Sequence, residues 1–449
     1  MRKIMLLFVC GLVLYPEEAS AQRECGAQAV KEILIAKDPS YAFKFAHRKE
    51  HAAQQTRLYQ ESLSKVKAKT TAVVKIPIVF HIVLNANQIN TLGGATGIRA
   101  RVHSQVDALN RDFSKKNGDT SSVPSAFKPL IGNAEIEFGL PRRKPDGSAT
   151  EGFEIITTTE SGFPMNSLAS GAKYSSTGGA DTWDPTRYLN VWIVNITPGG
   201  TLGFTLPPFS FSPGPEDGIV LTYGAFGVRA GATDYYLGGI DRGRTLTHEI
   251  GHYFNLDHVW GDDGGLCPTN GGSDDGVSDT PPQANYTYNS SHPGGVVPFP
   301  LLDNCTPSGS GIMWMNFMDY VNDAWMYMFT HGQVSRMRAT LASTGISHSL
   351  TQHPELFDWP TDVAHLEKER SINIYPNPTK GAFTISFANV SGLREIAVLN
   401  LMGQSVYSIK PANKTITNYS IDLTGVSMGV YMVQCTFDNG TITRKLAFQ

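Results

Sequence analysis

Residues 248–258 read His-Glu-Ile-Gly-His-Tyr-Phe-Asn-Leu-Asp-His, or HEIGHYFNLDH. His248 and His252 are four residues apart, so on a helix both imidazoles project from one face and can bind one metal ion. Glu249 lies beside them, where its carboxylate can hold a water molecule against that ion. The stretch therefore predicts a helix whose inner face carries a metal site.

His258 comes after this helix and can complete a three-histidine site only if the chain turns back. The turn falls at Asn255, which we expect to adopt a left-handed conformation, because asparagine tolerates it better than any residue except glycine. Three neutral imidazoles leave one zinc position open for water, whose pKa zinc lowers to about 7. Glu249 can then act as general base and pass the proton to the leaving amine. The alternative is a chance motif whose histidines only pack in a core.

The first residues indicate a secretory signal peptide over 1–21. Arg2 and Lys3 precede the short apolar run Ile4–Tyr15, and Ala19-Ser20-Ala21 supplies a small-x-small cleavage pattern. We expect no transmembrane segment, because no apolar run reaches the roughly 18 residues that a membrane-spanning helix needs.

Composition points to a globular protein of two or three domains: 449 residues, of which 41% are hydrophobic and 17% charged. The net charge of −3 comes without a basic stripe, so nucleic acid is not an expected partner. The polar residues 22–68 indicate a propeptide with a helical stretch and little core material. Residues 351–370 contain two prolines and a charged run that are typical of a linker.

Residues 69–350 predict an α+β catalytic domain, a mixed sheet backed by helices. KIPIVFHIVL at 75–84 has the apolar, β-branched pattern of a buried strand. One helix face carries Ile98, Val102, Val106, Leu109 and Phe113 at helical spacing. Further strands are expected at 134–140, 153–158, 188–196 and 218–223, and helices at 244–255 and 329–343.

HEIGHYFNLDH resembles the HExxHxxGxxH signature of the metzincin metallopeptidases, with Asn255 at the usual glycine. WMNFMDY resembles their Met-turn, which implies that Met318 lies beneath the zinc and that Tyr320 hydrogen-bonds the tetrahedral intermediate. The wider pattern, with SDTPPQ and MFTHGQVSRM, is similar to the pappalysin (M43-type) family. The resemblance implies two long helices, an irregular lower subdomain and an extended cleft. It also implies an endopeptidase whose polypeptide substrate pairs antiparallel with an edge strand in 200–225.

Cys267 and Cys305 flank one loop-rich segment and are the expected disulfide pair. Between them SDDGVSDT offers hard oxygen ligands suited to Ca²⁺, and a solvated acidic turn is the alternative. The pappalysin resemblance implies a structural calcium here, with Asp275, Asp279 and Thr280 as candidate ligands.

Cys25 resembles the propeptide cysteine found in part of this family. A thiolate is a strong zinc ligand, so Cys25 could occupy the open position and keep the enzyme latent. The alternative is a thiol without function.

Some relatives cleave before basic residues through an acidic residue just past the Met-turn. Asp323 lies there, so Arg or Lys at P1′ is a hypothesis.

Residues 371–449 predict a small β-sandwich of short alternating strands. YPNP, MGVY and the final KL strand resemble the sorting domain of the type IX secretion system of Bacteroidetes. This implies a bacterial protein, secreted and in some cases held at the cell surface, with the type IX machinery as partner. A zincin-fold adhesin without catalysis, exported by the same route, is the alternative function; Glu249 argues against it.

Overall fold

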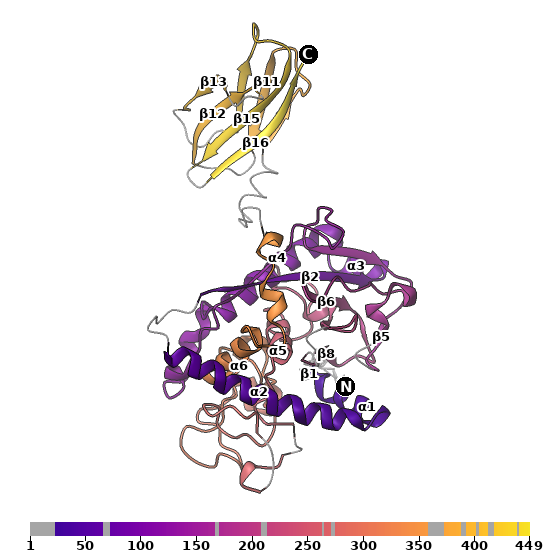
Figure 1. The fold of residues 1–449 in the computed structure, drawn as a ribbon, viewed down its shortest axis with the longest axis vertical. Helices are drawn as coiled ribbons and strands as arrows, with labels where there is room; N and C mark the ends of the chain where they lie inside the picture. Colours follow the sequence, from indigo (N-terminus) through magenta and orange to yellow (C-terminus); the bar gives the residue numbers. More distant parts are fainter. Residues whose placement is uncertain are drawn as a thin grey trace, which may run out of the picture. The chain divides into compact units, whose positions relative to one another are not determined.

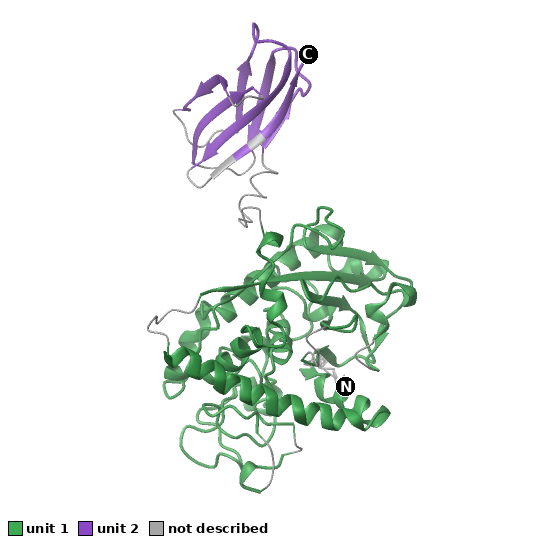
Figure 2. Cartoon of the chain, viewed as in Figure 1, with its two compact units in different colours: residues 1–357 green, residues 358–449 purple. Residues whose placement is uncertain are grey.

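In this computed structural model, the description covers residues 23–65, 72–166, 170–207, 213–262, 265–270, 274–357, 372–387, 392–400, 404–411, 417–437 and 440–449. The predicted signal peptide lies outside these residues. Two compact units divide the chain, Met1–Phe357 and Asp358–Gln449 (Figure 2). The first unit runs past the predicted domain end at 350, because Leu356 and Phe357 are buried against it.

A seven-stranded sheet forms the upper part of the first unit, in the order β1-β8-β9-β6-β2-β3, with β4 also paired to β2 (Figure 1). Its strands are β1 (Glu24–Cys25), β2 (Val74–Leu84), β3 (Ile136–Gly139), β4 (Phe153–Thr157), β6 (Leu189–Val194), β8 (Thr201–Phe204) and β9 (Ile219–Thr222). Strand β8 runs antiparallel to β9, while β2, β3, β4, β6 and β9 are mutually parallel. The predicted mixed sheet is therefore confirmed. Strands β5 (Phe163–Pro164) and β7 (Ile196–Thr197) form a separate pair.

Helices α4 and α5 pack together, α4 also against β3 and α5 also against β8 and β9. Helix α4 buries Ile98, Val102, Leu109 and Phe113 completely, as its apolar periodicity predicts. Fully burying a side chain of this kind stabilises the fold by about 1.5–3 kcal/mol. The first unit's helices are α1 (Ala27–Lys37), α2 (Ser40–Lys65), α3 (Ala86–Thr91), α4 (Gly94–Phe113), α5 (Arg244–Tyr253) and α6 (His331–Leu341).

The N-terminal segment, residues 23–65, contributes more to the core than its polar sequence predicts. Cys25, Ala27, Val30, Leu34 and Phe45 are all buried in the main hydrophobic cluster. Its long helix α2 lies beside α6, and β1 adds a strand to the edge of the sheet at β8 (Figure 1). The expectation of little core material was therefore wrong for these five side chains.

The second unit consists of two antiparallel sheets, ordered β10-β11-β14 and β13-β12-β15-β16. Their inner faces share one hydrophobic cluster, which confirms the predicted β-sandwich. The strands are β10 (Ile372–Tyr375), β11 (Ala382–Phe387), β12 (Leu393–Leu399), β13 (Ser405–Ile409), β14 (Asn418–Asp422), β15 (Gly429–Phe437) and β16 (Gly440–Phe448). Within the described residues, no helix has the length and apolarity to cross a membrane.

Candidate active site

Helix α5 ends in a turn that sends the chain back toward its own inner face. The backbone N–H of Asn255 donates to His252 O at 2.9 Å, and that of Leu256 donates to Gly251 O at 2.9 Å. This is the Schellman pattern, which requires a left-handed residue just past the helix. Asn255 has φ +71°, so the predicted conformation at this position is confirmed.

The turn brings the three predicted histidines together. Their Nε2 atoms lie 3.2 Å apart for His248 and His258, 3.2 Å for His252 and His248, and 3.0 Å for His252 and His258. All three side chains are buried. Burial lowers the pKa of His248 well below 6.5 and that of His252 to about 3, so both are neutral at pH 7.

The opposite nitrogens decide what this cluster can hold. Nδ1 donates to Phe317 O at 2.7 Å in His248, to Leu256 O at 2.9 Å in His252, and to the Asp262 carboxylate in His258. With each ring proton on Nδ1, three Nε2 lone pairs face one another. Three acceptors at this separation repel unless a cation lies between them, so the cluster fits a metal ion.

Glu249 lies next to this cluster and is fully buried. Its Oε2 lies 3.7 Å from Cys25 Sγ, and its Oε1 has no hydrogen-bond partner among the described residues. Burial raises the pKa of Glu249 to about 8. Gly203 of β8 leaves room for the Glu249 side chain, because a Cβ at position 203 would lie 3.0 Å from Glu249 Oε1. A carboxylate buried at this cost is typical of a catalytic group.

Met318 lies against helix α5 at Gly251, within the motif that carries His248 and His252. A Cβ on Gly251 would come within 2.4 Å of the Met318 sulfur, so the glycine of HEIGH makes room for this methionine. The preceding residue, Phe317, supplies the carbonyl that orients His248. Phe317 thus orients His248 through its backbone carbonyl, and Met318 packs against helix α5 through its side chain.

Cys25 and Tyr320 both lie beside the histidine cluster. The Cys25 sulfur and the three Nε2 atoms form a group whose possible ligand atoms all lie within 4.8 Å of one another. Tyr320 Oη accepts from Cys25 N at 3.1 Å and lies 3.4 Å from Cys25 O. Burial raises the pKa of the Cys25 thiol well above 9.0, so a thiolate here needs a nearby cation.

Arg23 is a fully buried cation two residues before Cys25. Its guanidinium pairs with Asp323 Oδ1 and donates to Thr245 Oγ1 at 3.3 Å. Asp323 is held from behind, because its Oδ2 accepts from the backbone N–H of Arg242 at 2.7 Å and of Arg244 at 3.3 Å. Asp323 is therefore buried and fully engaged, with one oxygen on the Arg23 guanidinium and the other on backbone amides.

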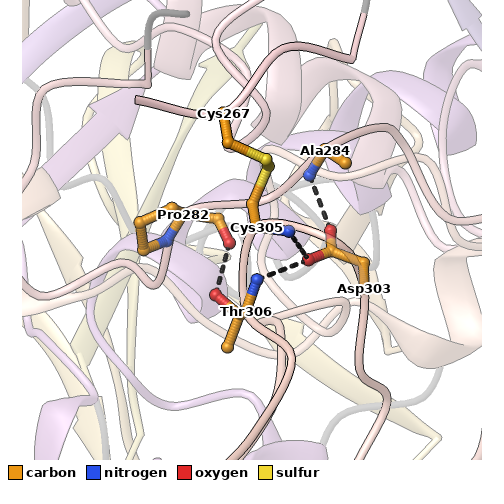
Figure 3. The surroundings of a disulfide bond; sticks show 6 residues. All are labelled: Cys267, Pro282, Ala284, Asp303, Cys305 and Thr306. Carbon is orange, nitrogen blue, oxygen red and sulfur yellow. Dashed lines mark hydrogen bonds between the residues drawn. A yellow bond between two sulfur atoms is a disulfide. The ribbon is translucent and has the colours of Figure 1, made fainter. Parts of the chain in front are cut away.

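The predicted disulfide joins Cys267 and Cys305, which are separated by 38 positions in the sequence (Figure 3). Closing a loop of this length stabilises the fold by about 4 kcal/mol in the chain-entropy account. Asp303 accepts from the backbone N–H groups of Ala284, Cys305 and Thr306, so the surrounding loop is also tied by hydrogen bonds.

The calcium candidates have protein partners. Asp275 accepts from Thr280 Oγ1 at 2.8 Å and from Val277 N at 3.0 Å. Asp279 lies apart from this pair, where it accepts from Thr330 Oγ1 and from Gly332 N at the start of α6. The Asp279 contacts attach the loop to the start of α6. The calcium site stays a prediction.

Three contacts of the site could not be read from the sequence. Asp262 orients His258, Trp260 stacks on the same ring with centroids 4.2 Å apart, and Arg23 pairs with Asp323. Asp262 follows His258 by four residues, but this spacing alone does not predict that the loop returns the carboxylate to the imidazole.

The fold and this site together define a metalloendopeptidase. Residues 173–342 match a peptidase family, M43, described as pregnancy-associated plasma protein-A, and residues 373–449 match the secretion system C-terminal sorting domain. Mature mirolysin of Tannerella forsythia, solved with a cleaved peptide, is 38% identical with a TM-score of 0.57, covering 64% of this chain and 99% of that one. A promirolysin mutant from the same organism is 34% identical with a TM-score of 0.62, covering 74% of this chain and 98% of that one.

Curated relatives agree with the structural ones. An extracellular metalloprotease of Arthroderma benhamiae is 28% identical over 330 residues, which cover 71% of this chain and 84% of that protein. The chain belongs to the M43 peptidase family and ends in a type IX secretion sorting domain. It is a secreted metalloendopeptidase that acts on polypeptides outside the cell or at its surface.

Proposed function

We propose that this chain is the latent precursor of a zinc-dependent endopeptidase in which Glu249 is the general base. The observation that carries the proposal is the convergence of three Nε2 atoms within 3.0–3.2 Å, each with its Nδ1 engaged elsewhere. Neutral imidazole is the usual zinc ligand, and three of them form a typical catalytic set.

Bound zinc would supply Lewis acidity toward the scissile carbonyl and would acidify water. Glu249 takes the proton of the attacking water and delivers it to the leaving amine. Its complete burial beside the three imidazoles supports this role, because buried carboxylates with perturbed pKa values cluster at catalytic sites. The Tyr320 hydroxyl, now at the Cys25 backbone, would donate to the substrate carbonyl oxygen as negative charge develops there.

We propose that residues 22–68 are a propeptide and that Cys25 blocks the site as a fourth ligand. The Cys25 sulfur belongs to the same candidate metal group as the three histidines. Strand β1 runs parallel to β8, with Cys25 opposite Gly203. A substrate that pairs antiparallel with β8 would run in the reverse direction, so β1 covers the binding strand in an orientation unsuited to cleavage. The match extends from 64% to 74% of this chain when the relative is promirolysin, which supports the assignment.

We also propose a preference for Arg or Lys at P1′. Arg23 and Asp323 form a fully buried ion pair, and Arg23 lies two residues before Cys25, which belongs to the histidine cluster. A buried carboxylate with one oxygen already fixed by backbone amides selects a cationic partner, since an uncharged one would leave it unpaired. The arginine of the N-terminal segment thus occupies the place that a basic substrate side chain would take.

Casein cleavage measured after tryptic removal of the N-terminal segment tests the central proposal. Chelation should abolish activity and added zinc should restore it. Glu249→Ala should lower kcat by about 10²–10⁴-fold while the protein still binds one zinc per chain. Glu137→Ala, which removes an exposed carboxylate on β3, is the control and should leave kcat unchanged. Activity that survives chelation or Glu249→Ala would reject the mechanism and favour the adhesin.

A further inference from the structure

His258 is held differently from the other two histidines. His248 and His252 project from helix α5, and their Nδ1 atoms donate to backbone carbonyls. His258 lies beyond the helix and its turn, in a stretch without regular structure. Its Nδ1 instead faces a carboxylate, with Asp262 Oδ1 at 2.7 Å and Oδ2 at 2.9 Å.

The loop between them is built to return this carboxylate to the ring. Gly261 N donates to His258 O at 2.9 Å, and both Gly261 and Asp262 have positive φ, +74° and +57°. Left-handed backbone at a non-glycine residue costs free energy, so Asp262 is held there by its contacts. The Asp262–His258 hydrogen bond is the contact that this conformation serves.

We propose that Asp262 is a positioning residue that sets the orientation and basicity of His258, and through them the zinc affinity of the site. This inference rests on the proposed zinc-dependent function. A carboxylate on Nδ1–H fixes which nitrogen faces the metal and increases electron density on Nε2. Loss of such a partner typically weakens metal binding by about 10–100-fold.

Trp260 makes the inference testable without unfolding the site. Its indole stacks on the His258 ring with an interplanar angle of 8°, and it meets Tyr320 edge-on with centroids 4.7 Å apart. The stack restrains the plane of the imidazole, while Asp262 restrains its rotation within that plane. Removing the carboxylate should therefore change the affinity of a ring that stays in place.

A second carboxylate–histidine pair in the same chain supplies a matched control. Glu154 Oε1 lies 2.6 Å from His81 Nδ1, but His81 Nε2 faces Asn190 Oδ1 at 2.9 Å. The chemistry of the pair is the same, yet no other ring nitrogen converges on His81 among the described residues. Glu154→Gln removes an equivalent charge from a structural histidine.

The test is zinc competition with a chromogenic chelator, on the full-length chain and on the trypsin-activated enzyme. Asp262→Ala should weaken zinc binding by about 10–100-fold, and Asp262→Asn, which keeps an acceptor oxygen, should weaken it less. Glu154→Gln should stay within about twofold of wild type. The kcat/KM of activated Asp262→Asn should fall at limiting zinc and return to within a few-fold of wild type at saturating zinc.

Each outcome separates the inference from the function on which it rests. A wild-type chain that binds no zinc would remove the proposed function. Wild-type zinc binding with unchanged affinity in both Asp262 variants would overturn only the inference. Equal losses in Asp262→Asn and Glu154→Gln would also overturn it, because the effect would then be a general consequence of losing a half-buried charge beside a histidine. The Asn variant keeps the shape of the side chain, so a misfolded Ala variant leaves the comparison decisive.

Discussion

Asn255 shows how one side chain can serve both the fold and the site. Its backbone adopts the left-handed turn that glycine usually provides. Its side chain also makes hydrogen bonds that a glycine could not make. Nδ2 donates to Thr340 Oγ1 at 3.1 Å, while Oδ1 accepts from Arg48 at 2.7 Å. The turn that presents His258 is thus tied to α6 and to the N-terminal segment.

Two substitutions should separate strain from hydrogen bonding at Asn255. Asn255→Gly loses both side-chain bonds but relaxes the backbone, whereas Asn255→Ala loses them and retains the left-handed strain. We expect Ala to be less stable than Gly by about 1 kcal/mol, with wild type above both. Urea unfolding in a Glu249→Ala background, which prevents self-cleavage, measures this order. Equal stability of Gly and Ala would show that the turn carries no strain.

Asp323 should control the P1′ preference. Asp323→Asn keeps the shape of the side chain but leaves a basic partner without its counter-charge. We expect kcat/KM for peptides with Arg at P1′ to fall by about 10²-fold or more, because an unpaired buried charge costs several kcal/mol. The same peptides with Leu at P1′ are the internal control and should not become worse substrates. An unchanged Arg preference in a peptide library would place the specificity elsewhere.

At the scale of elements, apolar periodicity predicted the helices and strands whose structure depends on their own sequence. The motif helix, α4 and the strands β2, β4, β6 and β9 follow from apolar periodicity, with ends shifted by a few residues. Strand β1 could not be found this way, because its two residues are a strand only through pairing with β8, far away in the sequence. The histidine cluster was predictable because a motif encodes it, whereas Asp262 and Arg23 depend on how loops and termini return to it.

Arg48 should contribute strongly to the docking of helix α2. The half-buried Asp257 carboxylate pairs with Lys49 at 3.2 Å and with Arg48 at 3.8 Å. Arg48 also donates to Asn255 Oδ1. Hydrogen bonds to a charged group contribute about 1.5–3 kcal/mol each. Arg48→Ala should therefore raise the population of undocked α2 by about 10–100-fold.

Limited proteolysis of the full-length chain reports this undocking. A protease that cuts within α2 should act faster on Arg48→Ala by the same factor, provided that cleavage samples a rapidly opening helix. Lys44→Ala is the matched control, because that lysine lies on the same helix over the Tyr41 ring. Faster cleavage of both variants alike would point to a general loss of helix stability and not to release from Asn255 and Asp257.

At the scale of the whole molecule, the chain is built from two units with separate cores. The described members of the main cluster lie between Cys25 and Leu350, and those of the sandwich cluster between Ile372 and Phe448. Pairing of β12 with β15 and of β15 with β16 completes the sandwich within its own residues. Each described cluster therefore draws its members from one unit.

A chain that ends at Phe357 should keep the peptidase and lose its export. We expect the thermal midpoint and the kcat/KM after trypsin activation to match those of the full-length enzyme, while the protein stays inside cells that possess the type IX machinery.

A chain that ends at Gln352 is the sharper comparison. It also removes Leu356, which is 1% exposed and packs with Val79, Trp183 and Tyr188. Losing such a side chain costs about 2–5 kcal/mol, so this shorter chain should melt measurably earlier. A midpoint that falls equally in both truncations would mean that the sorting domain stabilises the peptidase after all.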